Sequence, residues 1–196
     1  FYEQVDRLKY DLLPKIGYRN LIEVEGFEAD DILAQAARDI PSEDEAVIVT
    51  ADADLLQCVS SNVIFHNPTS KKTVTAKSFK EEWNLAPEQW AHVKALAGCH
   101  GDDVPGIKGI GEKSAAGWFN GSLKRGKKYD LISENLEVIA RNLPLVKLPF
   151  PGLVLPEFVM DQVTESKKMA VQTELGIRAR RGVKKPTKVL SGGFDV

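Results

Sequence analysis

The first forty residues alternate apolar and polar positions with the spacing of short, regular elements. An apolar stripe with helical spacing predicts a helix over residues 1–16, which ends at Gly17. Residues 20–24 (NLIEV) are predicted to form a short strand. Residues 28–40 follow as an amphipathic helix whose apolar face points inward.

The middle of the chain continues the alternation of strand and helix. Residues 46–50 (AVIVT) are a continuous apolar, β-branched run, which is typical of a strand buried on both faces. A short helix is predicted over 53–59, a third strand over 62–67, and a turn with an edge hairpin over 68–75. Strands that alternate with helices need crossover connections, so we expect an α/β fold with a mostly parallel sheet flanked by helices.

The second half of the chain is predicted to be helical, with no strand beyond residue 100. The expected helices span residues 77–83, 87–98, 112–119 and 127–142. Residues 143–156 are punctuated by prolines and are expected to be extended. The chain from about residue 160 is predicted to be helical at first and basic afterwards.

Charge is distributed unevenly, although the net charge is only −2. Residues 23–54 carry eleven acids against one base, whereas residues 104–128 carry six bases against one acid. Residues 167–188 carry eight bases against Glu174. This pattern fits a protein that holds cations in one place and a polyanion in another, and solvated faces that happen to segregate would give the same composition.

Cysteine usage and hydropathy set the expected compartment. The two cysteines form neither a metal-binding spacing nor a disulfide framework, and no apolar run reaches membrane-spanning length. We therefore expect a cytoplasmic protein with no membrane partner.

Two groups of carboxylates follow predicted strands. Glu28, Asp30 and Asp31 lie on the first turn of the helix after the first strand, and Asp52 and Asp54 come just after the second. Ligands of open parallel sheets bind beyond the carboxyl ends of the strands, so the two groups are expected to meet there. Asp52 and Asp54 are two residues apart and would point the same way if the chain stayed extended.

Each acid taken singly also has a structural explanation. Acids in a first turn complement the helix dipole, and Asp52 is placed to cap the following helix. Taken together, however, clustered carboxylates repel each other unless a cation lies between them. Oxygen ligands with no nearby His or Cys indicate Mg²⁺ or Mn²⁺, and two such ions about 3.5–4 Å apart are the usual device for phosphodiester hydrolysis.

A glycine-spaced turn, GIKGIG at residues 106–111, lies between two predicted helices. It is neither a P-loop, because Glu112 separates Gly111 from Lys113, nor a dinucleotide fingerprint, because a third glycine is missing and a helix precedes it. Amides at a helix N-terminus bind phosphate, so the turn is predicted to hold a DNA backbone without reading its sequence. An ordinary helix–helix turn is the alternative. The predicted DNA contacts are Lys108, Gly109, Gly111, Lys113 and Ser114.

Three motifs in order, EGFEADD, TADADLLQ and LAGCHGDDVPGIKGIGEKSA, resemble the 5′-3′ exonuclease/flap endonuclease family of bacteriophages and bacteria. The family includes the 5′-nuclease domain of bacterial DNA polymerase I, and the resemblance covers about residues 1–140. It implies a PIN-like nuclease core, a helix-three-turn-helix DNA-binding module, two Mg²⁺ or Mn²⁺ ions, and DNA with a 5′ end, nick or flap as substrate. It also implies the cytoplasm of a bacterial or phage-infected cell.

Mapped on this resemblance, the chain divides into three parts. Residues 1–86 would be the C-terminal part of the nuclease core, 87–160 the DNA-binding module with its following helices, and 161–196 a basic tail. By position, the family's metal carboxylates match Glu28, Asp30, Asp31, Asp52, Asp54 and Asp102, of which Asp30, Asp31, Asp52 and Asp54 are predicted to be catalytic. The family's K⁺ site, made of backbone carbonyls, matches Leu96, Ala97, Pro105, Ile107 and Ile110.

Two departures from the family pattern qualify this prediction. Cys99 stands where the family has an acid, which should weaken the second metal site. The chain also begins roughly where the family's arch has ended, so a companion chain or an N-terminal segment is expected to supply a missing first strand. A metal-dependent nuclease is therefore the leading interpretation and a non-catalytic DNA-binding module the alternative. A PIN-type ribonuclease is disfavoured by the glycine turn.

Overall fold

The structure, a computed structural model, describes residues 1–99 and 101–177. These residues form two compact units, one spanning Ile22–Pro156 and the other combining Phe1–Leu21 with the residues from Glu157 onward. The boundaries predicted at 86/87 and 160/161 do not coincide with these units and stay a functional prediction. In the part of the chain that the structure describes, no helix is both long enough and apolar enough to cross a bilayer.

The unit that holds the N-terminus is helical. It contains α1 (Tyr2–Arg7), the π-helical turn η1 (Leu8–Leu12), α2 (Leu13–Ile16) and α9 (Glu165–Glu174). The predicted helix over residues 1–16 is thus confirmed, and Gly17 ends it with a φ of 111°. Helix α9 packs on α2, and Glu174 accepts a hydrogen bond from Lys15 at 3.1 Å, so the helix predicted after about residue 160 is present. The remaining basic stretch, 178–196, lies outside the described residues.

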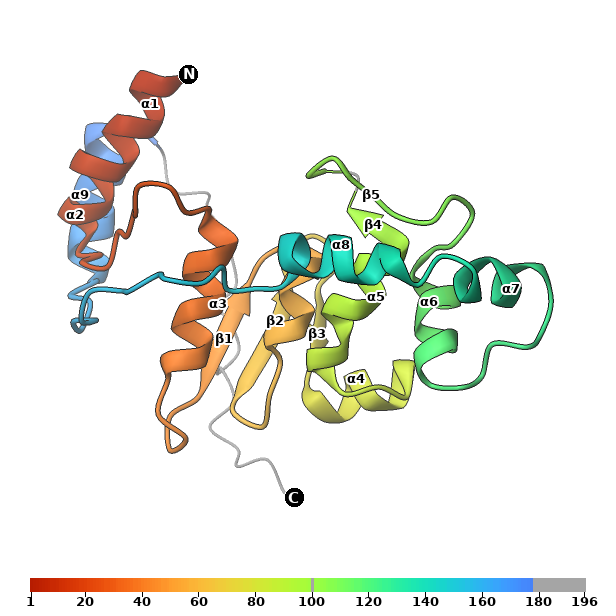
Figure 1. The fold of residues 1–196 in the computed structure, drawn as a ribbon. Helices are drawn as coiled ribbons and strands as arrows, with labels where there is room; N and C mark the ends of the chain where they lie inside the picture. The colour runs from red at the N-terminus through yellow and green to blue at the C-terminus, as the bar shows by residue number, and fades with distance from the viewer. Residues whose placement is uncertain (100, 178–196) are drawn as a thin grey trace. The chain divides into compact units, whose positions relative to one another are not determined.

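The larger unit is built on a small sheet with the strand order β1-β2-β3. Strands β1 (Ala46–Val49) and β2 (Val63–Asn67) are parallel, and β3 (Lys72–Val74) returns antiparallel to β2 through the predicted hairpin turn. Helix α3 (Ala29–Asp39) lies alongside β1 (Figure 1), and the 3₁₀ helix η2 (Ala53–Cys58) follows β1 directly. The expected strand–helix alternation is therefore present, with one parallel and one antiparallel strand pair.

Two expectations about the strands are wrong. Residues 20–24 form no strand, because an extended segment becomes a strand only when a neighbour accepts and donates its hydrogen bonds. Strand β1 is not buried on both faces: Ile48 is 5% exposed, but Val47 and Val49 are 57% and 58% exposed. Val47 and Val49 lie on the same face of β1, and among the described residues no layer covers that face.

The rest of the larger unit is helical and is centred on α5 (Trp90–Ala97), which packs against α6 and α8. The other elements are α4 (Ala76–Trp83), η3 (Pro87–Gln89), β4 (Gly98–Cys99), β5 (Val104–Pro105), α6 (Glu112–Phe119), α7 (Lys127–Ser133) and α8 (Glu137–Val146). The two-residue strands β4 and β5 pair as a small hairpin, so the expectation of no strand beyond residue 100 is wrong.

Helix α8 continues past the point where the sequence predicts an extended segment. It includes Pro144 and ends at Val146. Leu143 and Val146 pack into a small apolar cluster with Cys99, and this packing compensates for the backbone hydrogen bond that a proline removes.

One hydrophobic core joins the sheet to the helices. Trp90 is 1% exposed and meets Phe79 edge-to-face with ring centroids 5.6 Å apart. Its indole N–H donates to the Ala53 carbonyl at 2.9 Å, which fixes η2 against α5. Trp83 and Trp118 pack against the same core, so all three tryptophans of the sequence serve packing.

Candidate metal centre and nucleic-acid interface

An open pocket of about 400 Å³ gathers acids from three separate segments of the larger unit. The acids come from the start of α3, from η2 and from the loop between β4 and β5, and the segment 145–150 forms the opposite wall. The acidic lining residues are Glu28, Asp30, Asp31, Asp54, Asp102 and Asp103. Five of the six predicted metal carboxylates thus line one pocket, and Asp52 is not among the residues that line it.

The carboxylate of Asp31 accepts hydrogen bonds from two backbone amides. Its Oδ1 accepts a hydrogen bond from the Phe150 amide at 2.7 Å, and its Oδ2 accepts one from the Glu28 amide at 3.3 Å. The first bond ties the segment 145–150 to α3, and the second caps the helix. Asp31 is 8% exposed, so its first role in the structure is to hold the pocket wall in place.

The surroundings of Asp30 disfavour its charged form. Burial raises the pKa of Asp30, the Asp31 amide at 2.8 Å partly lowers it, and the negative charges of Asp31 and Glu28 raise it further. The net pKa lies above the ordinary value of an aspartate. A cation in the pocket would relieve this penalty, so the oxygen donors around Asp30 fit a hard divalent ion.

Asp52 acts as a helix cap. Its Oδ1 accepts a hydrogen bond from the Asp54 amide at 2.9 Å, and its own amide donates to Thr50 Oγ1 at 3.1 Å. The chain turns into the 3₁₀ helix η2 at Ala53, so the two aspartates do not continue an extended segment. The capping role considered for Asp52 is therefore observed, and its catalytic role stays a prediction.

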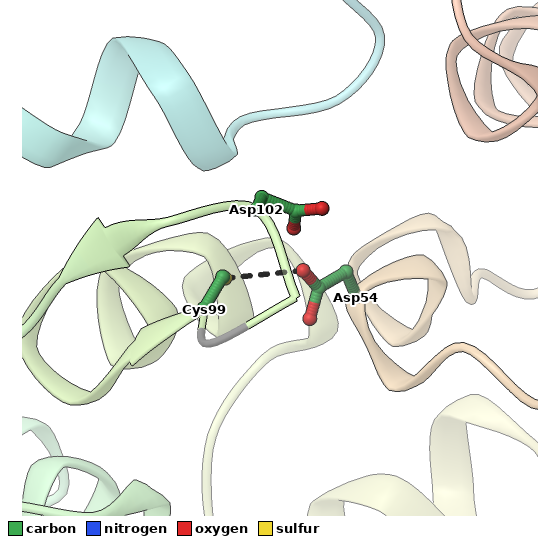
Figure 2. Close-up of side chains that lie close together, drawn as sticks. All are labelled: Asp54, Cys99 and Asp102. Atoms are coloured by element: carbon green, nitrogen blue, oxygen red, sulfur yellow. Dashed lines mark hydrogen bonds between the residues drawn. The ribbon is translucent and has the colours of Figure 1, made fainter.

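Asp54 contacts a cation and a thiol at the same time. Its Oδ1 lies 2.8 Å from Lys94 Nζ, and its Oδ2 accepts the Cys99 S–H at 3.1 Å. Figure 2 shows Asp54, Cys99 and Asp102 turned toward one another, and one ligand atom of each lies within 4.8 Å of the others. With one oxygen bound to an ammonium and sulfur in place of an expected carboxylate, this donor set fits Mg²⁺ poorly.

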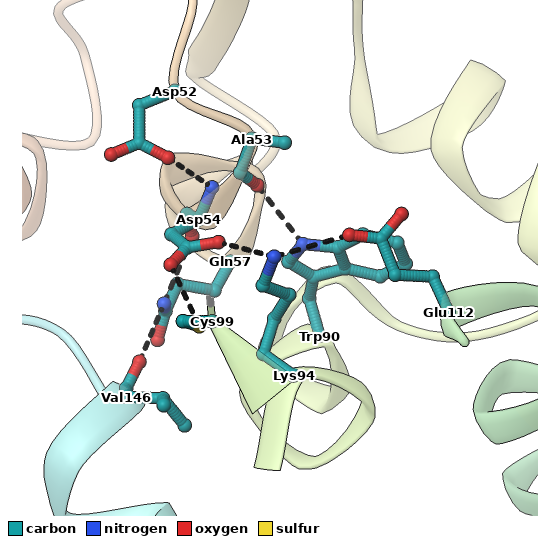
Figure 3. A network of polar contacts seen from close by, with 9 residues as sticks. All are labelled: Asp52, Ala53, Asp54, Gln57, Trp90, Lys94, Cys99, Glu112 and Val146. Atoms are coloured by element: carbon teal, nitrogen blue, oxygen red, sulfur yellow. Dashed lines mark hydrogen bonds and ion pairs between the residues drawn. The ribbon is translucent and has the colours of Figure 1, made fainter. Parts of the chain in front are cut away.

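Lys94 was not predicted as a site residue. It bridges Asp54 to Glu112 Oε1, which lies 3.1 Å from Nζ at the first residue of α6 (Figure 3). Burial lowers the pKa of Lys94, but the hydrogen bonds and charges of its two partners outweigh burial and raise it. A signal was present in the sequence, because Lys94 lies in a mostly apolar helix and a lysine that is buried there needs an acid.

Cys99 is a neutral, shielded thiol. It lies in β4 with 4% exposure, and burial together with the hydrogen bond to Asp54 raises its pKa to about 12. It therefore adds no negative charge to the pocket at neutral pH. The only other cysteine in the sequence, Cys58, has its pKa raised to about 12 by burial and by the charge of Asp30.

The side chain of Gln57 links η2 to the segment 145–150 that lines the pocket. This buried side chain donates to the carbonyls of Asp54 and Val146, at 2.9 and 3.1 Å, and accepts from the Leu148 amide at 2.9 Å. Figure 3 shows its contact with the end of α8. The acidic residues therefore rest on a rigid frame of backbone and amide contacts.

The glycine turn uses its glycines in two ways. A Cβ on Gly106 would overlap the backbone of Ala97 and Gly98, so this glycine is needed for close approach of the chain to itself. Gly109, with a φ of 89°, and Gly111, which caps α6, have open space where a Cβ would lie. The part of the turn predicted to contact DNA is thus the part that leaves its backbone open.

The side chains beside the turn differ in their availability. Lys108 and Lys113 are exposed, whereas Ser114 Oγ accepts a hydrogen bond from Lys128 Nζ at 2.9 Å. Lys128 therefore adds a cation next to the N-terminus of α6 that the sequence reasoning did not assign to the turn. The DNA contacts themselves stay a prediction.

Three of the five carbonyls predicted to hold K⁺ already accept hydrogen bonds. Those of Leu96 and Ile107 accept from backbone amides, each at 2.9 Å. The Pro105 carbonyl accepts from Asn142 Nδ2 at 2.9 Å and from the Arg141 guanidinium at 3.0 Å. A guanidinium on one of the carbonyls opposes a second cation there, and the potassium site stays a prediction.

Comparison with known proteins defines the class to which this fold and pocket belong. Residues 1–84 match the family model of the 5′-3′ exonuclease N-terminal resolvase-like domain. Over this region the chain is similar to the 5′-3′ exonuclease family, and the relatives described next extend the similarity to between 65% and 76% of the chain.

Its relatives include bacterial DNA polymerases I. The thermostable enzyme of Thermus thermophilus is 40% identical over 138 residues, which are 70% of this chain and 15% of that protein. DNA polymerase I of Mycobacterium tuberculosis is 38% identical over 164 residues, which are 76% of this chain and 18% of that protein. The chain thus spans less than a fifth of the length of these relatives.

Solved structures of bacteriophage T5 5′-exonuclease share the fold. The form with bound zinc is 25% identical, with a TM-score of 0.56 over 65% of this chain and 52% of that one. A T5 flap endonuclease in complex with DNA and metal ions matches with the same identity, TM-score and coverage. A PIN-like, resolvase-like nuclease fold with helices around a small sheet is therefore the fold of this chain.

Proposed function

We propose that this chain contributes the metal-binding pocket and the DNA-holding turn of a 5′ nuclease that hydrolyses DNA phosphodiester bonds at a 5′ end, nick or flap. The single observation that carries the proposal is the convergence of Glu28, Asp30, Asp54 and Asp102 on one pocket. The similarity to this family and the metal-bound and DNA-bound T5 relatives support the same chemistry.

The residues divide the work by their surroundings. Burial and the neighbouring carboxylates disfavour the charged form of Asp30, so Asp30, together with Glu28, would hold a divalent Mg²⁺ or Mn²⁺ ion. Ions in this pocket, when bound, would activate water and stabilise charge on the phosphate. Asp31 and Gln57 hold the walls of the pocket in place, and the backbone at Gly109 and Gly111, which has open space beside it, would contact the phosphates of a duplex.

A non-catalytic DNA-binding module is the second candidate. It is favoured by the state of Asp54, which already has the Lys94 ammonium as its cation and a neutral thiol as its neighbour. A pocket that binds only one ion efficiently would retain DNA binding and lose most of its hydrolytic rate.

The test is cleavage of 5′-labelled flap DNA by the purified chain with Mg²⁺ or Mn²⁺, comparing the unmodified chain with Asp30→Asn and Asp44→Asn. Asp44 is exposed and is not among the residues that line the pocket, so its replacement controls for loss of one negative charge. Cleavage that is lost with Asp30→Asn and kept with Asp44→Asn supports the nuclease.

Failure to cut has to be separated from failure to bind. Flap DNA binding is measured without divalent ions on the unmodified chain and on Gly111→Val, which places a side chain over the start of α6. A folded chain that binds DNA, loses binding with Gly111→Val and cuts with neither ion is the binding module, and the nuclease proposal is then rejected.

A further inference from the structure

We propose that the cluster Asp54–Cys99–Asp102 is a site for a thiophilic divalent ion such as Zn²⁺ or Co²⁺, in the place where a nuclease of this type would hold its second Mg²⁺. The inference rests on the proposed function, because it assigns the ion preference of that same pocket. It concerns only the cluster with Cys99, and it leaves the carboxylates around Asp30 to a hard ion.

The donors are already close to the spacing that such an ion requires. One ligand atom from each residue lies within 4.8 Å of the other two, and the Cys99 sulfur is 3.1 Å from Asp54 Oδ2. With zinc–sulfur and zinc–oxygen bonds of about 2.3 and 2.1 Å, a tetrahedral site places such donors about 3.6 Å apart. The observed separations bracket this value, so side-chain shifts of about an ångström complete three of the four positions.

The same donors suit Mg²⁺ badly. Magnesium needs nearly octahedral oxygen coordination, and a thiolate sulfur is a soft ligand that it does not select. Lys94 occupies Asp54 Oδ1 at 2.8 Å, which leaves only Oδ2 for an ion. Three protein ligands with an open fourth position are instead the usual arrangement of a catalytic zinc site.

Ion binding exchanges one bond of the thiol for another. The Cys99 S–H, which now donates to Asp54 Oδ2, breaks; a sulfur–metal bond forms, and the proton leaves to the solvent. The released Oδ2 becomes the second ligand, so the bond that is lost frees the oxygen that the ion needs. Asp102, on the exposed loop between β4 and β5, would supply the third.

Cobalt provides a readout that does not depend on nuclease activity. Co²⁺ bound to a thiolate gives a sulfur-to-metal charge-transfer absorption in the near ultraviolet, and the sequence has two cysteines, which makes the control simple. The unmodified chain, Cys99→Ser and Cys58→Ser are titrated with CoCl₂ under reducing conditions. Near-ultraviolet circular dichroism checks that each variant keeps its tertiary packing.

We expect the charge-transfer band in the unmodified chain and in Cys58→Ser, and its loss in Cys99→Ser. In Cys99→Asp the band should vanish, and Cd²⁺, measured by its displacement of bound Mn²⁺, should compete at least about tenfold more weakly than in the unmodified chain, since even outer-shell changes cost about 10–100-fold in metal affinity. Mg²⁺ should compete better in Cys99→Asp than in the unmodified chain.

Two results would overturn the inference and are distinguishable from each other. A band that is absent, or that follows Cys58, while Mn²⁺ still binds would reject the thiolate site and leave the proposed nuclease pocket intact. No binding of any divalent ion to the folded chain would reject both the thiolate site and the proposed function.

Discussion

The contact between Lys94 and Asp54 makes a quantitative prediction about the stability of the larger unit. Replacing Lys94 with Met keeps the length of the side chain and removes its charge. The side chains of Lys94 and Asp54 are only 11% and 14% exposed, so the substitution leaves a poorly solvated carboxylate with no cationic partner at 2.8 Å. Glu112, the other partner, is 40% exposed and contributes little.

The magnitude follows from the distance and the burial. At 2.8 Å and an effective dielectric constant of about 20, Coulomb's law gives about 6 kcal/mol for the pair. Part of this is offset, because the variant no longer desolvates an ammonium, and breaking a buried pair typically costs about 3–5 kcal/mol. With the residual exposure of both side chains, we expect Lys94→Met to lower the free energy of unfolding by about 2–4 kcal/mol.

Urea unfolding followed by tryptophan fluorescence measures this change in the larger structural unit. Trp83, Trp90 and Trp118, the three tryptophans of the sequence, all lie between Ile22 and Pro156. The matched control is Lys72→Met, since Lys72 lies 2.7 Å from Glu82 but both side chains are half-exposed. For an exposed pair we expect a loss of about 0–1 kcal/mol.

The raised pKa of Lys94 determines how this loss of stability depends on pH. The pKa of Lys94 is raised above 10.5 in the folded chain, so its stabilisation is fully present below that pH and is lost only as the pH rises through the folded pKa. The difference between Lys94→Met and the unmodified chain should therefore stay constant from about pH 6 to 9. Equal, small effects of Lys94→Met and Lys72→Met would refute the reasoning that burial makes the Asp54 contact strong.

Two further predictions concern the acids and the turn. Because the pKa of Asp30 is raised in the folded chain, its charged carboxylate destabilises the fold at any pH above the ordinary value of 3.8. Asp30→Asn should therefore raise the melting temperature near neutral pH in the presence of a chelator, and this gain should disappear as the pH falls below 3.8. A lower melting temperature of the variant at neutral pH would contradict this prediction. Gly106→Ala should destabilise the chain by more than about 3 kcal/mol, or prevent folding, because the added Cβ would overlap the Ala97 backbone. Gly111→Ala, whose Cβ would lie in open space, should change stability by less than about 0.5 kcal/mol. Equal urea midpoints for the two variants would show that the close approach at Gly106 is not required.

Local sequence patterns were sufficient for much of the fold. The helix Glu112–Phe119 coincides with its prediction, and the strand after Glu45 and the helix after Glu28 are off by only a residue or two. These elements have strong apolar periodicity and clear start signals. The segment 20–24 has the composition of a strand, but strand formation depends on a hydrogen-bonding neighbour that its own sequence cannot specify.

The convergence of the acids was predictable, but their individual states were not. The 3₁₀ helix that follows β1 and the first turn of α3 meet at one pocket, which Asp54 and Asp30 line, although the strand predicted before α3 does not form. Asp52 and Asp54 were expected to share a direction, and the 3₁₀ turn at Ala53 gives one of them a capping role instead. Asp54 has a cationic partner because Lys94, forty residues further along the chain, lies beside it in the fold.

Helix α5 and the residues just after it hold the Asp54 carboxylate in a fixed position. Trp90 and Lys94, one helical turn apart, contact the Ala53 carbonyl and the Asp54 carboxylate, and Cys99, just past the end of the helix, contacts the same carboxylate (Figure 3). Three contacts from one rigid segment fix η2 against α5, so Asp54 cannot relax away from whichever group stands at position 99. If the proposed ion site is correct, the thiol at that position changes the ion that the cluster selects, and the glycine turn, which follows β5, keeps open space beside Gly109 and Gly111.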